Sequence, residues 1–322
     1  RGLPCVYREV SMDGDFSHEE TLMVKAAWYY YMENYTQQNI STLLGVSRVR
    51  VIRLLEKARQ DGIISFHIRQ DSDRRMQVEK ELITRFGLHD VFVTPISGRV
   101  SELNESLAQA AAIYISDRLG GSFFINMGYG DTPSRILNHL ARKTEIPINV
   151  VSLTGGVSYY LPNTQSSIFN ARLHLIPSPL LLSKPEMVEE LRKEVSVQRI
   201  QQMSWESSMT VVGIGSMSDD ATIIKNGILT HEDFLLLTLQ GAVGDILSHF
   251  IDKDGNPIES TLDNRLLSTP LEDLKRMNNV IGVAGGLDKV DAIRAVLNGH
   301  YLDVLITDEE TATVLLHPHD QT

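Results

Sequence analysis

The chain has 322 residues, of which 42% are hydrophobic, and its formal net charge at pH 7 is −11. This length can bury one large core and one small core, so we expect two domains. The sequence contains no apolar run of about eighteen residues, no signal-peptide pattern and a single cysteine, Cys5. Composition therefore excludes a membrane-spanning helix and an internal disulfide framework, and we expect a cytoplasmic protein with no membrane partner.

The first helix is predicted over residues 18–34, where apolar residues cover more than one face. Residues 1–11 show no periodicity and no initiating methionine, so we place the first domain at residues 12–70, with Met12 as the natural start. Part of the apolar surface of this helix should pack on the elements that follow. The aromatic remainder, around Trp28–Tyr31, is available to a second subunit.

The stretch Thr36–Gln60 predicts two short helices separated by the turn Gly45-Val46-Ser47. Gly45 suits the left-handed backbone of a sharp turn, and the hydroxyl of Ser47 can cap the second helix. The expected core residues recur at helical spacing: Ile40, Leu43, Leu44, Val46, Val51, Leu54 and Leu55. This pattern is typical of a helix-turn-helix that binds the major groove of double-stranded operator DNA.

The second of these helices is the predicted nucleic-acid interface. The side chains expected to face away from the core and to bind DNA are Ser47, Arg48, Val49, Arg50, Arg53 and Lys57. Residues 48–75 hold eight basic and four acidic side chains, a net charge of +4 within an acidic chain. The alternative is a solvated basic helix in an ordinary bundle, which does not account for the turn glycine and the flanking core positions. Residues 61–68, DGIISFHI, predict a turn and a wing strand.

Residues 71–87 are predicted to form an amphipathic linker helix, and residues 88–322 a larger α/β domain. In that domain short β-rich runs alternate with helical segments, which is typical of a mostly parallel sheet flanked by helices. The predicted strands lie in the runs at residues 91–96, 122–130, 148–156, 209–215, 278–286 and 302–307. Residues 185–203 predict one helix, which is either a solvated cover or a subunit contact.

The loop Gly128–Ser134 is a candidate phosphate cradle, because it follows a predicted strand where ligands bind in open α/β sheets. Its glycines let the backbone approach an anion, and Pro133 suits the first turn of a helix. Thr132 and Ser134 add hydroxyl donors. The loop is neither a Walker loop nor a full dinucleotide fingerprint, so the alternative interpretation is a tight strand-to-helix turn.

Further candidate residues lie in other turns of the same domain. Glycine-rich turns occur at Thr154-Gly155-Gly156, Gly213–Ser216 and Gly282–Gly286. Asp245 could accept hydrogen bonds from sugar hydroxyls and Lys289 could offer a cation to a hydroxyl or a phosphate, although each could equally be a surface charge. The ten histidines are scattered and no G-x-S-x-G turn occurs, so we assign no metal ligand and no catalytic residue.

Six stretches, in the same order, resemble the SorC family of bacterial sugar-operon regulators. They are residues 36–64, 152–157, 211–224, 241–247, 282–286 followed by Lys289, and 306–312. The resemblance covers the chain from about residue 20 onward. It implies an N-terminal winged helix-turn-helix, a C-terminal effector domain similar to sugar-phosphate isomerases, and assembly into homotetramers.

The same resemblance implies an effector site. In the family, the loop that matches Gly130-Asp131-Thr132 holds the ligand phosphate, and the turn that matches Thr154-Gly155-Gly156 lines the pocket. Asp245 and Lys289 match contacts to the ligand hydroxyls. The expected effector site is therefore Gly128, Gly130, Asp131, Thr132, Thr154, Gly155, Gly156, Asp245 and Lys289. The sequence departs from the family at Thr132-Pro133 and at residues 158–162, which leaves the carbon skeleton of the effector open.

The function implied is a DNA-binding transcriptional regulator, in repressor mode, of a carbohydrate or autoinducer-2 uptake operon. Its expected effector is a phosphorylated sugar or phospho-autoinducer-2, and no cofactor is expected. The main alternative is a sugar-phosphate isomerase or deaminase with an accessory DNA-binding domain. Such an enzyme needs a base and an electrophile, for which Asp245 and Lys289 are the placed candidates. A constitutive architectural DNA-binding protein would need no ligand at all.

Overall fold

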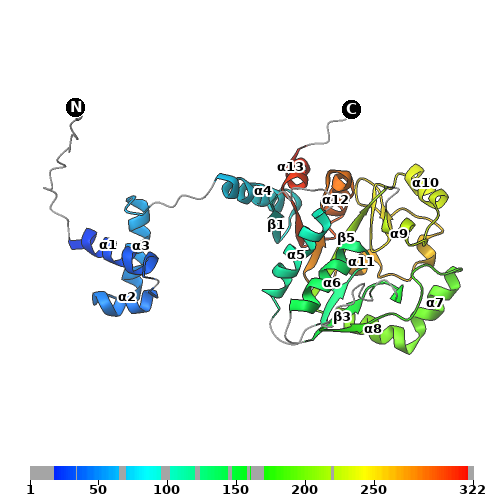
Figure 1. The fold of residues 1–322 in the computed structure, drawn as a ribbon, viewed down its shortest axis with the longest axis horizontal. Helices are drawn as coiled ribbons and strands as arrows, with labels where there is room; N and C mark the ends of the chain where they lie inside the picture. The colour runs from blue at the N-terminus through cyan, green and yellow to red at the C-terminus, as the bar shows by residue number, and fades with distance from the viewer. Residues whose placement is uncertain are drawn as a thin grey trace, which may run out of the picture. The chain divides into compact units, whose positions relative to one another are not determined.

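The computed structural model forms two compact units, residues 1–70 and residues 71–322 (Figure 1). The residues that the structure describes are 18–33, 35–64, 70–95, 102–119, 124–143, 147–157, 160, 170–218 and 221–317. The predicted start at Met12 and residues 65–68 of the predicted wing strand lie outside the described residues, as do most of residues 158–162. The two units are described separately below.

The N-terminal unit contains helices α1 (His18–Tyr31), α2 (Gln37–Leu44) and α3 (Arg48–Gln60). Gly45 ends α2 in the left-handed conformation, with φ of 64°. The Ser47 hydroxyl caps α3 by accepting a hydrogen bond of 3.2 Å from the Arg50 amide. Both features confirm the predicted helix-turn-helix. The core beneath these helices is formed by Leu22, Met23, Ala26, Ala27, Ile40, Val51, Leu54, Leu55 and Ala58.

Two expectations for this unit are corrected. Leu43 was expected in the core, but its residue surface is 54% exposed, because one face of the short helix α2 is enough to cover α3. Helix α1 ends at Tyr31 and not at Asn34. Leu44 and Val46, which were also predicted for the core, are half-buried and pack against it.

Helix α4 (Gln70–Phe86) is the predicted linker helix, and it packs into the larger unit. Val78, Leu82 and Phe86 are buried there in a core that also includes Val91 and Leu315. Met76 is exposed. The apolar side of this helix therefore belongs to the larger unit, and the segment is not a free connector.

The larger unit is organised around a parallel sheet with the strand order β1-β9-β8-β5-β2-β3-β4. Each of the six predicted β-rich runs overlaps one of these strands, and β4 was not predicted. The bounds are β1 (Asp90–Thr94), β2 (Phe124–Met127), β3 (Ile148–Ser152), β4 (Ala171–His174), β5 (Met209–Ser216), β8 (Val280–Val283) and β9 (Val304–Asp308). Two short strands, β6 (Gly244–Ile246) and β7 (His249–Ile251), form a hairpin that pairs antiparallel with the end of β5.

The two faces of the sheet are covered by different helices, because successive side chains of a strand point to opposite faces. Val211, Ile281 and Ile306 share a core with α5 (Leu103–Ser116) and α6 (Asp131–Lys143). The adjacent residues Val212, Val280 and Leu305 belong to the core on the other face, with α4, α12 (Val290–Asn298) and α13 (Glu309–Leu316). This is the α/β layer arrangement that the alternation of strands and helices predicted (Figure 1).

The remaining elements connect the strands and cover the edges of the sheet. The single helix predicted over residues 185–203 is two helices, because Glu194 adopts an extended conformation with ψ of 133°. The bounds are α7 (Pro185–Lys193), α8 (Val195–Trp205), α9 (Thr222–Lys225), α10 (His231–Leu239), η3 (Asp263–Arg265), α11 (Leu271–Leu274) and η4 (Leu287–Lys289). Within the described residues, no helix combines the length and the apolar character that crossing a lipid bilayer requires.

Candidate effector pocket and nucleic-acid interface

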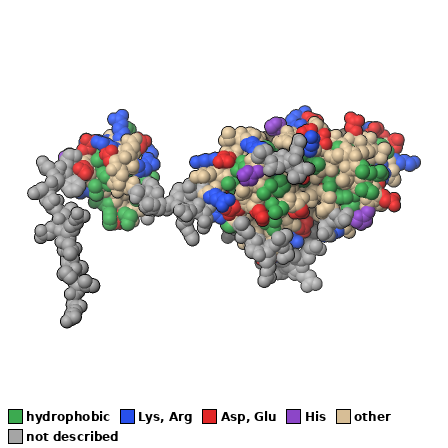
Figure 2. Space-filling model, turned by 90° about the horizontal axis from the view of Figure 1, so that it is seen from above, with side chains coloured by type: hydrophobic (Ala, Val, Ile, Leu, Met, Phe, Trp, Pro, Cys, Tyr) green, Lys and Arg blue, Asp and Glu red, His purple; other side chains and the backbone are tan. Residues whose placement is uncertain are grey.

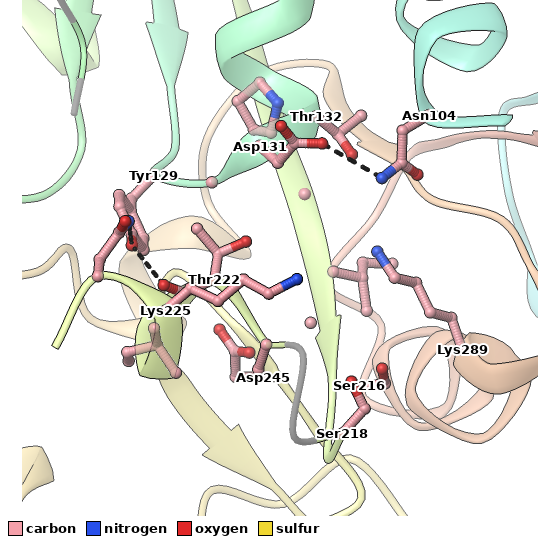
Figure 3. A pocket seen from close by; sticks show the side chains of 18 of the residues that line it. Asn104, Tyr129, Asp131, Thr132, Ser216, Ser218, Thr222, Lys225, Asp245 and Lys289 are labelled. Atoms are coloured by element: carbon pink, nitrogen blue, oxygen red, sulfur yellow. Dashed lines mark hydrogen bonds between the residues drawn. The ribbon is translucent and has the colours of Figure 1, made fainter. Parts of the chain in front are cut away.

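A pocket of about 480 Å³ lies at the switch point of the sheet, between the carboxyl ends of β2 and β5 (Figure 3). From β2 the chain winds toward β3 and β4, whereas from β5 it winds in the opposite direction, toward β8 and β9. The connections therefore diverge and leave a crevice, which is where open α/β sheets bind ligands. The lining residues include Tyr129, Gly130, Asp131, Thr132, Pro133, Gly215, Ser216, Thr222, Lys225, Asn226, Asp245 and Lys289.

The amino end of α6 forms one wall of the pocket. Gly130 has φ of 140°, a conformation suited to glycine, and it directs the chain into the helix at Asp131. Pro133 fits close to β5 because Gly213 has no side chain: a Cβ there would lie 3.1 Å from the Pro133 ring. The first-turn amides of a helix have no partner within the helix, and together with the helix dipole they attract an anion.

The Asp131 side chain is held by its neighbours. Its Oδ2 accepts hydrogen bonds from Arg135 Nε at 2.9 Å and from Asn104 Nδ2 at 3.2 Å. Arg135 also contacts Glu105 at 2.7 Å. The hydrogen bond from Arg135 is the main reason that the pKa of Glu105 is lowered. Asp131 therefore stabilises the start of α6, and its backbone is better placed than its carboxylate to meet an anion.

Asp245 was predicted to lie in a glycine-rich turn. In the structure it lies on strand β6, opposite Gly215 of β5. The loop prediction was wrong because a three-residue strand is too short to show periodicity. A Cβ at Gly215 would overlap Asp245 Oδ1, so the carboxylate lies directly against the backbone of β5. Burial raises the pKa of Asp245 to about 6, although the amide of Ser248 and the charge of Lys289 oppose that rise.

Lys289 reaches the pocket from the junction between η4 and α12. The preceding Gly286 has φ of 104°, and its amide donates to Asp308 Oδ2 at 3.0 Å and to Thr311 Oγ1 at 2.8 Å. Asp308 also caps α13 through the amide of Thr311. Residues 306–312, one of the six stretches that resemble the SorC family, therefore do not line the pocket. Asp308 and Thr311 instead hold the turn that precedes Lys289.

A second lysine, Lys225 on α9, enters the same pocket and was missed by the sequence prediction. Figure 3 shows the side chains of Lys225 and Lys289 reaching into the pocket from opposite sides, with Thr132 above them and Asp245 below in this view. The Tyr129 hydroxyl, from the loop after β2, donates to the Thr222 carbonyl at 3.4 Å and accepts from Asn226 Nδ2. These bonds tie α9 to the phosphate-side loop. A four-residue helix has no periodicity that could have identified Lys225.

Four of the predicted site residues do not line the pocket. A Cβ at Gly128 would lie 2.8 Å from Leu247, and one at Gly155 would overlap the Pro179 carbonyl. Thr154 Oγ1 lies 2.7 Å from the Tyr160 hydroxyl, and the Gly156 amide donates to Ser178 at 2.7 Å. The structure thus gives Gly128 and Thr154-Gly155-Gly156 packing contacts behind the pocket. Gly130, Asp131, Thr132, Asp245 and Lys289 come together in it.

The nucleic-acid interface predicted on α3 lies on the surface of the N-terminal unit. Arg48, Val49, Arg50 and Arg53 are exposed, whereas Val51, Leu54 and Leu55 face the core. Figure 2 shows Lys and Arg side chains gathered along part of this unit. The exposed Lys57 forms a 3.2 Å ion pair with Glu19 of α1. Glu19 would therefore compete with a DNA phosphate for the Lys57 ammonium group.

An open hollow of about 890 Å³ extends this surface from Arg48 toward the start of α2. It is lined by Tyr30, Tyr31, Tyr35, Thr36, Gln37, Gln38 and Arg48. Thr36 caps α2 through a 3.2 Å bond from the Asn39 amide. In helix-turn-helix proteins the first helix of the pair crosses the DNA backbone, so these polar side chains are further candidates for phosphate contacts. The sequence prediction for α2 rested on its apolar core positions, and these do not identify the polar residues at its start.

The comparisons with known proteins agree on the class of protein. Residues 71–317 match the family described as "Putative sugar-binding domain". The transcriptional regulator LsrR of Klebsiella pneumoniae is 34% identical over 302 residues, which cover 92% of this chain and 93% of that protein. LsrR of Escherichia coli K12 is 33% identical over 302 residues, which cover 92% and 95%. The crystal structure of the full-length sorbitol operon regulator SorC from Klebsiella pneumoniae superposes with a TM-score of 0.66, at 26% identity, over 94% of this chain and 100% of that one.

These matches define a transcriptional regulator with a sugar-binding domain. The chain belongs to the SorC family of sugar-responsive transcriptional regulators. The predicted fold class, a helical DNA-binding unit followed by an α/β effector domain, is confirmed. Within the described part of the chain, no group of three or more His, Cys, Asp or Glu side chains is arranged to hold a metal ion.

Proposed function

We propose that this protein binds operator DNA through α2 and α3 and that a phosphorylated sugar-like effector in the pocket changes its affinity for that DNA. The regulated genes would form a carbohydrate or autoinducer-2 uptake operon, and the protein would act as their repressor. Support comes from relatives named LsrR and from the sorbitol operon regulator. We further propose that it works as a homotetramer in the cytoplasm.

The pocket at the switch point carries this proposal. It combines an anion-binding helix start with two lysines and a carboxylate. A phosphate group would bind at the first turn of α6, where backbone amides and the helix dipole favour negative charge. Asp245 would accept hydrogen bonds from sugar hydroxyls, and Lys225 and Lys289 would contact the remaining oxygens. A ligand that joins these elements can shift the equilibrium between two domain arrangements only through its differential affinity for them.

Calorimetry with the full chain tests this proposal. Pentose and hexose phosphates are titrated in parallel with the same sugars lacking phosphate, and operator binding is measured with and without each compound. We expect binding by at least one phosphorylated sugar, none by its unphosphorylated form, and a change in operator affinity on binding. Ligand binding that left operator affinity unchanged would contradict the regulatory part of the proposal.

One observation favours an enzyme as the second candidate. A carboxyl with a pKa near 6, next to a lysine, is what a general base in a sugar-phosphate isomerase requires. We nevertheless propose binding without turnover, because relatives covering nearly the whole chain are transcriptional regulators. Incubation with pentose and hexose phosphates, followed by product analysis, distinguishes the two. Turnover that was lost in Asp245→Asn would establish the enzyme.

Oligomer formation is supported by the surface of α1. Val24 and Trp28 share one side of α1 and are 43% and 55% exposed; Met32, in the turn directly after the helix, is 64% exposed. Burial of such a stripe against a second helical unit would place two α3 helices on adjacent half-sites of an operator, about 10 base pairs or a multiple apart. Light scattering at micromolar concentration measures the assembly, and a monomer with and without operator DNA would contradict it.

A further inference from the structure

The hairpin that carries Asp245 has an unusual turn. Leu247 and Ser248 connect β6 to β7, and both have positive φ, 53° and 66°. Turns of this hand normally use Asn or Gly, because other side chains are strained in the left-handed region. Neither residue is glycine or asparagine, so the hairpin requires contacts that hold it in place.

Contacts from three directions hold the turn. The Ser248 amide donates to Asp245 Oδ2 at 3.2 Å, and Ser268 Oγ donates to the Leu247 carbonyl at 2.7 Å. The Leu247 side chain fills the space left by the missing Cβ of Gly128. The orientation of Asp245 is therefore coupled to the turn, because its carboxylate is one of the groups that stabilise it.

His249, the first residue of β7, forms a further polar link between this hairpin and the rest of the unit. Its ring is buried, with Nδ1 2.6 Å from Asp263 Oδ1 and Nε2 3.0 Å from the Thr269 carbonyl. A carbonyl oxygen only accepts, so Nε2 must carry a proton. On the other side of the ring, Nδ1 faces the carboxyl group of Asp263, which is partly exposed. The ring therefore has a polar partner on both sides, and these two partners fix its orientation.

The segment that holds His249 is itself bound to the main sheet. Thr269 donates to the Leu153 carbonyl from its amide at 2.8 Å and from its hydroxyl at 2.9 Å. Ser268 forms a bridge with Thr154, and the Gly155 amide donates to the Leu267 carbonyl at 2.7 Å. Thus the turn at Thr154-Gly155 after β3 supports residues 263–269, and these support His249.

We propose that His249, held between Asp263 and Thr269, is the positioning residue that keeps the Asp245 hairpin facing the effector pocket. The consequence for the effector rests on the proposed function of that pocket. His249 does not line the pocket, so it acts through the hairpin and not by touching a ligand. The charged groups near it are Asp263, with which it pairs, and Asp245 on the paired strand, whose pKa its positive charge lowers.

The contact between His249 and Asp263 is tested by ring nitrogen NMR of the full chain labelled at histidine. Asp263→Asn removes the carboxylate that faces Nδ1 and should shift the Nδ1 resonance of His249. The matched control Glu190→Gln removes a carboxylate from an exposed ion pair with Lys193 and should leave His249 unchanged. A His249 ring whose nitrogen resonances do not respond to Asp263→Asn overturns the proposal.

The positioning role is tested by two further measurements on His249→Asn and Asp263→Asn. Carboxyl carbon NMR should show the titration of Asp245 shifted to higher pH in both variants, and an unchanged titration overturns the proposal. Affinity for ribose 5-phosphate should fall about tenfold, which is about 1.4 kcal/mol, while affinity for inorganic phosphate at α6 changes less than about twofold. Equal losses for both probes also overturn it. If the unmodified protein binds neither probe, the proposed function fails, and the Asp245 titration still decides the role of His249.

Discussion

The two candidate sites of this protein are built in opposite ways. Most of the predicted nucleic-acid interface lies on α3, whose inner face packs on a small core while its outer face carries Arg48, Arg50 and Arg53. The effector pocket is assembled from five separate segments, between Asn104 and Lys289. A substitution on the outer face of α3 changes a contact and little else. A substitution in the pocket changes the packing that creates the site, so stability and affinity should change together.

The largest expected effect separates two glycines on the same strand. Gly215→Ala would place a methyl group on Asp245 Oδ1 and displace the hairpin, and we expect effector affinity to fall about 100-fold, or about 3 kcal/mol. Gly213→Ala is the matched control, because its Cβ would lie 3.1 Å from the Pro133 ring and needs only a small shift. Calorimetry with a phosphorylated sugar measures both. If Gly215→Ala bound as tightly as Gly213→Ala, Asp245 would not be an effector contact.

Asp245→Asn should raise stability and lower affinity at the same time. The pKa of Asp245 is about 6 when folded, above the ordinary value of 3.8, so its ionisation destabilises the folded state as the pH rises through this window. We expect the amide to increase the free energy of unfolding by about 1–3 kcal/mol at a pH of about 7.5 and to change it little near a pH of about 4. Effector affinity should fall by about 1–3 kcal/mol, because an amide is a weaker acceptor for hydroxyls.

Urea unfolding at the two pH values and calorimetry at the higher one provide the measurements. Asp288→Asn is a suitable control, because Asp288 also lines the pocket but is exposed. A loss of stability in Asp245→Asn at the higher pH would mean that the ionised carboxylate forms net favourable contacts. That result would contradict the explanation that burial raises the pKa of Asp245.

Arg48→Ala tests the simpler of the two sites. If Arg48 reads a base edge, operator affinity should fall by about 1–3 kcal/mol and discrimination should relax at one position, whereas random DNA should be affected less. Stability should change by less than about 0.5 kcal/mol, because Arg48 lies outside the core. Arg59→Ala, an exposed cation at the far end of α3, is the control. Gel-shift titrations on operator and random DNA measure both, and equal losses on the two would make Arg48 a phosphate contact.

The same contrast explains what the sequence could predict. Gly45, Ser47 and the core positions of α2 and α3 act on near neighbours, so their spacing was enough to identify the helix-turn-helix. The strands of the sheet were found for the same reason. The hairpin strands β6 and β7, the lysine on α9 and the contact between His249 and Asp263 depend on pairings between distant segments. Short elements carry no periodicity, and nothing in the local sequence of Asp245 indicates that it lies against Gly215.

The smallest expected effect concerns Lys57, a predicted DNA contact that forms an ion pair with Glu19. Both partners of the Lys57–Glu19 pair are about half exposed, so the pair should contribute about 0–1 kcal/mol to stability. If Lys57 also contacts a DNA phosphate, Lys57→Ala should reduce the salt dependence of operator binding by about one unit of slope. Glu19→Gln should then strengthen binding slightly, because it releases the ammonium group from its competitor. In the double variant the effect of Glu19→Gln should disappear, since it acts only through Lys57. An effect of Glu19→Gln that persisted without Lys57 would instead indicate repulsion between Glu19 itself and the DNA.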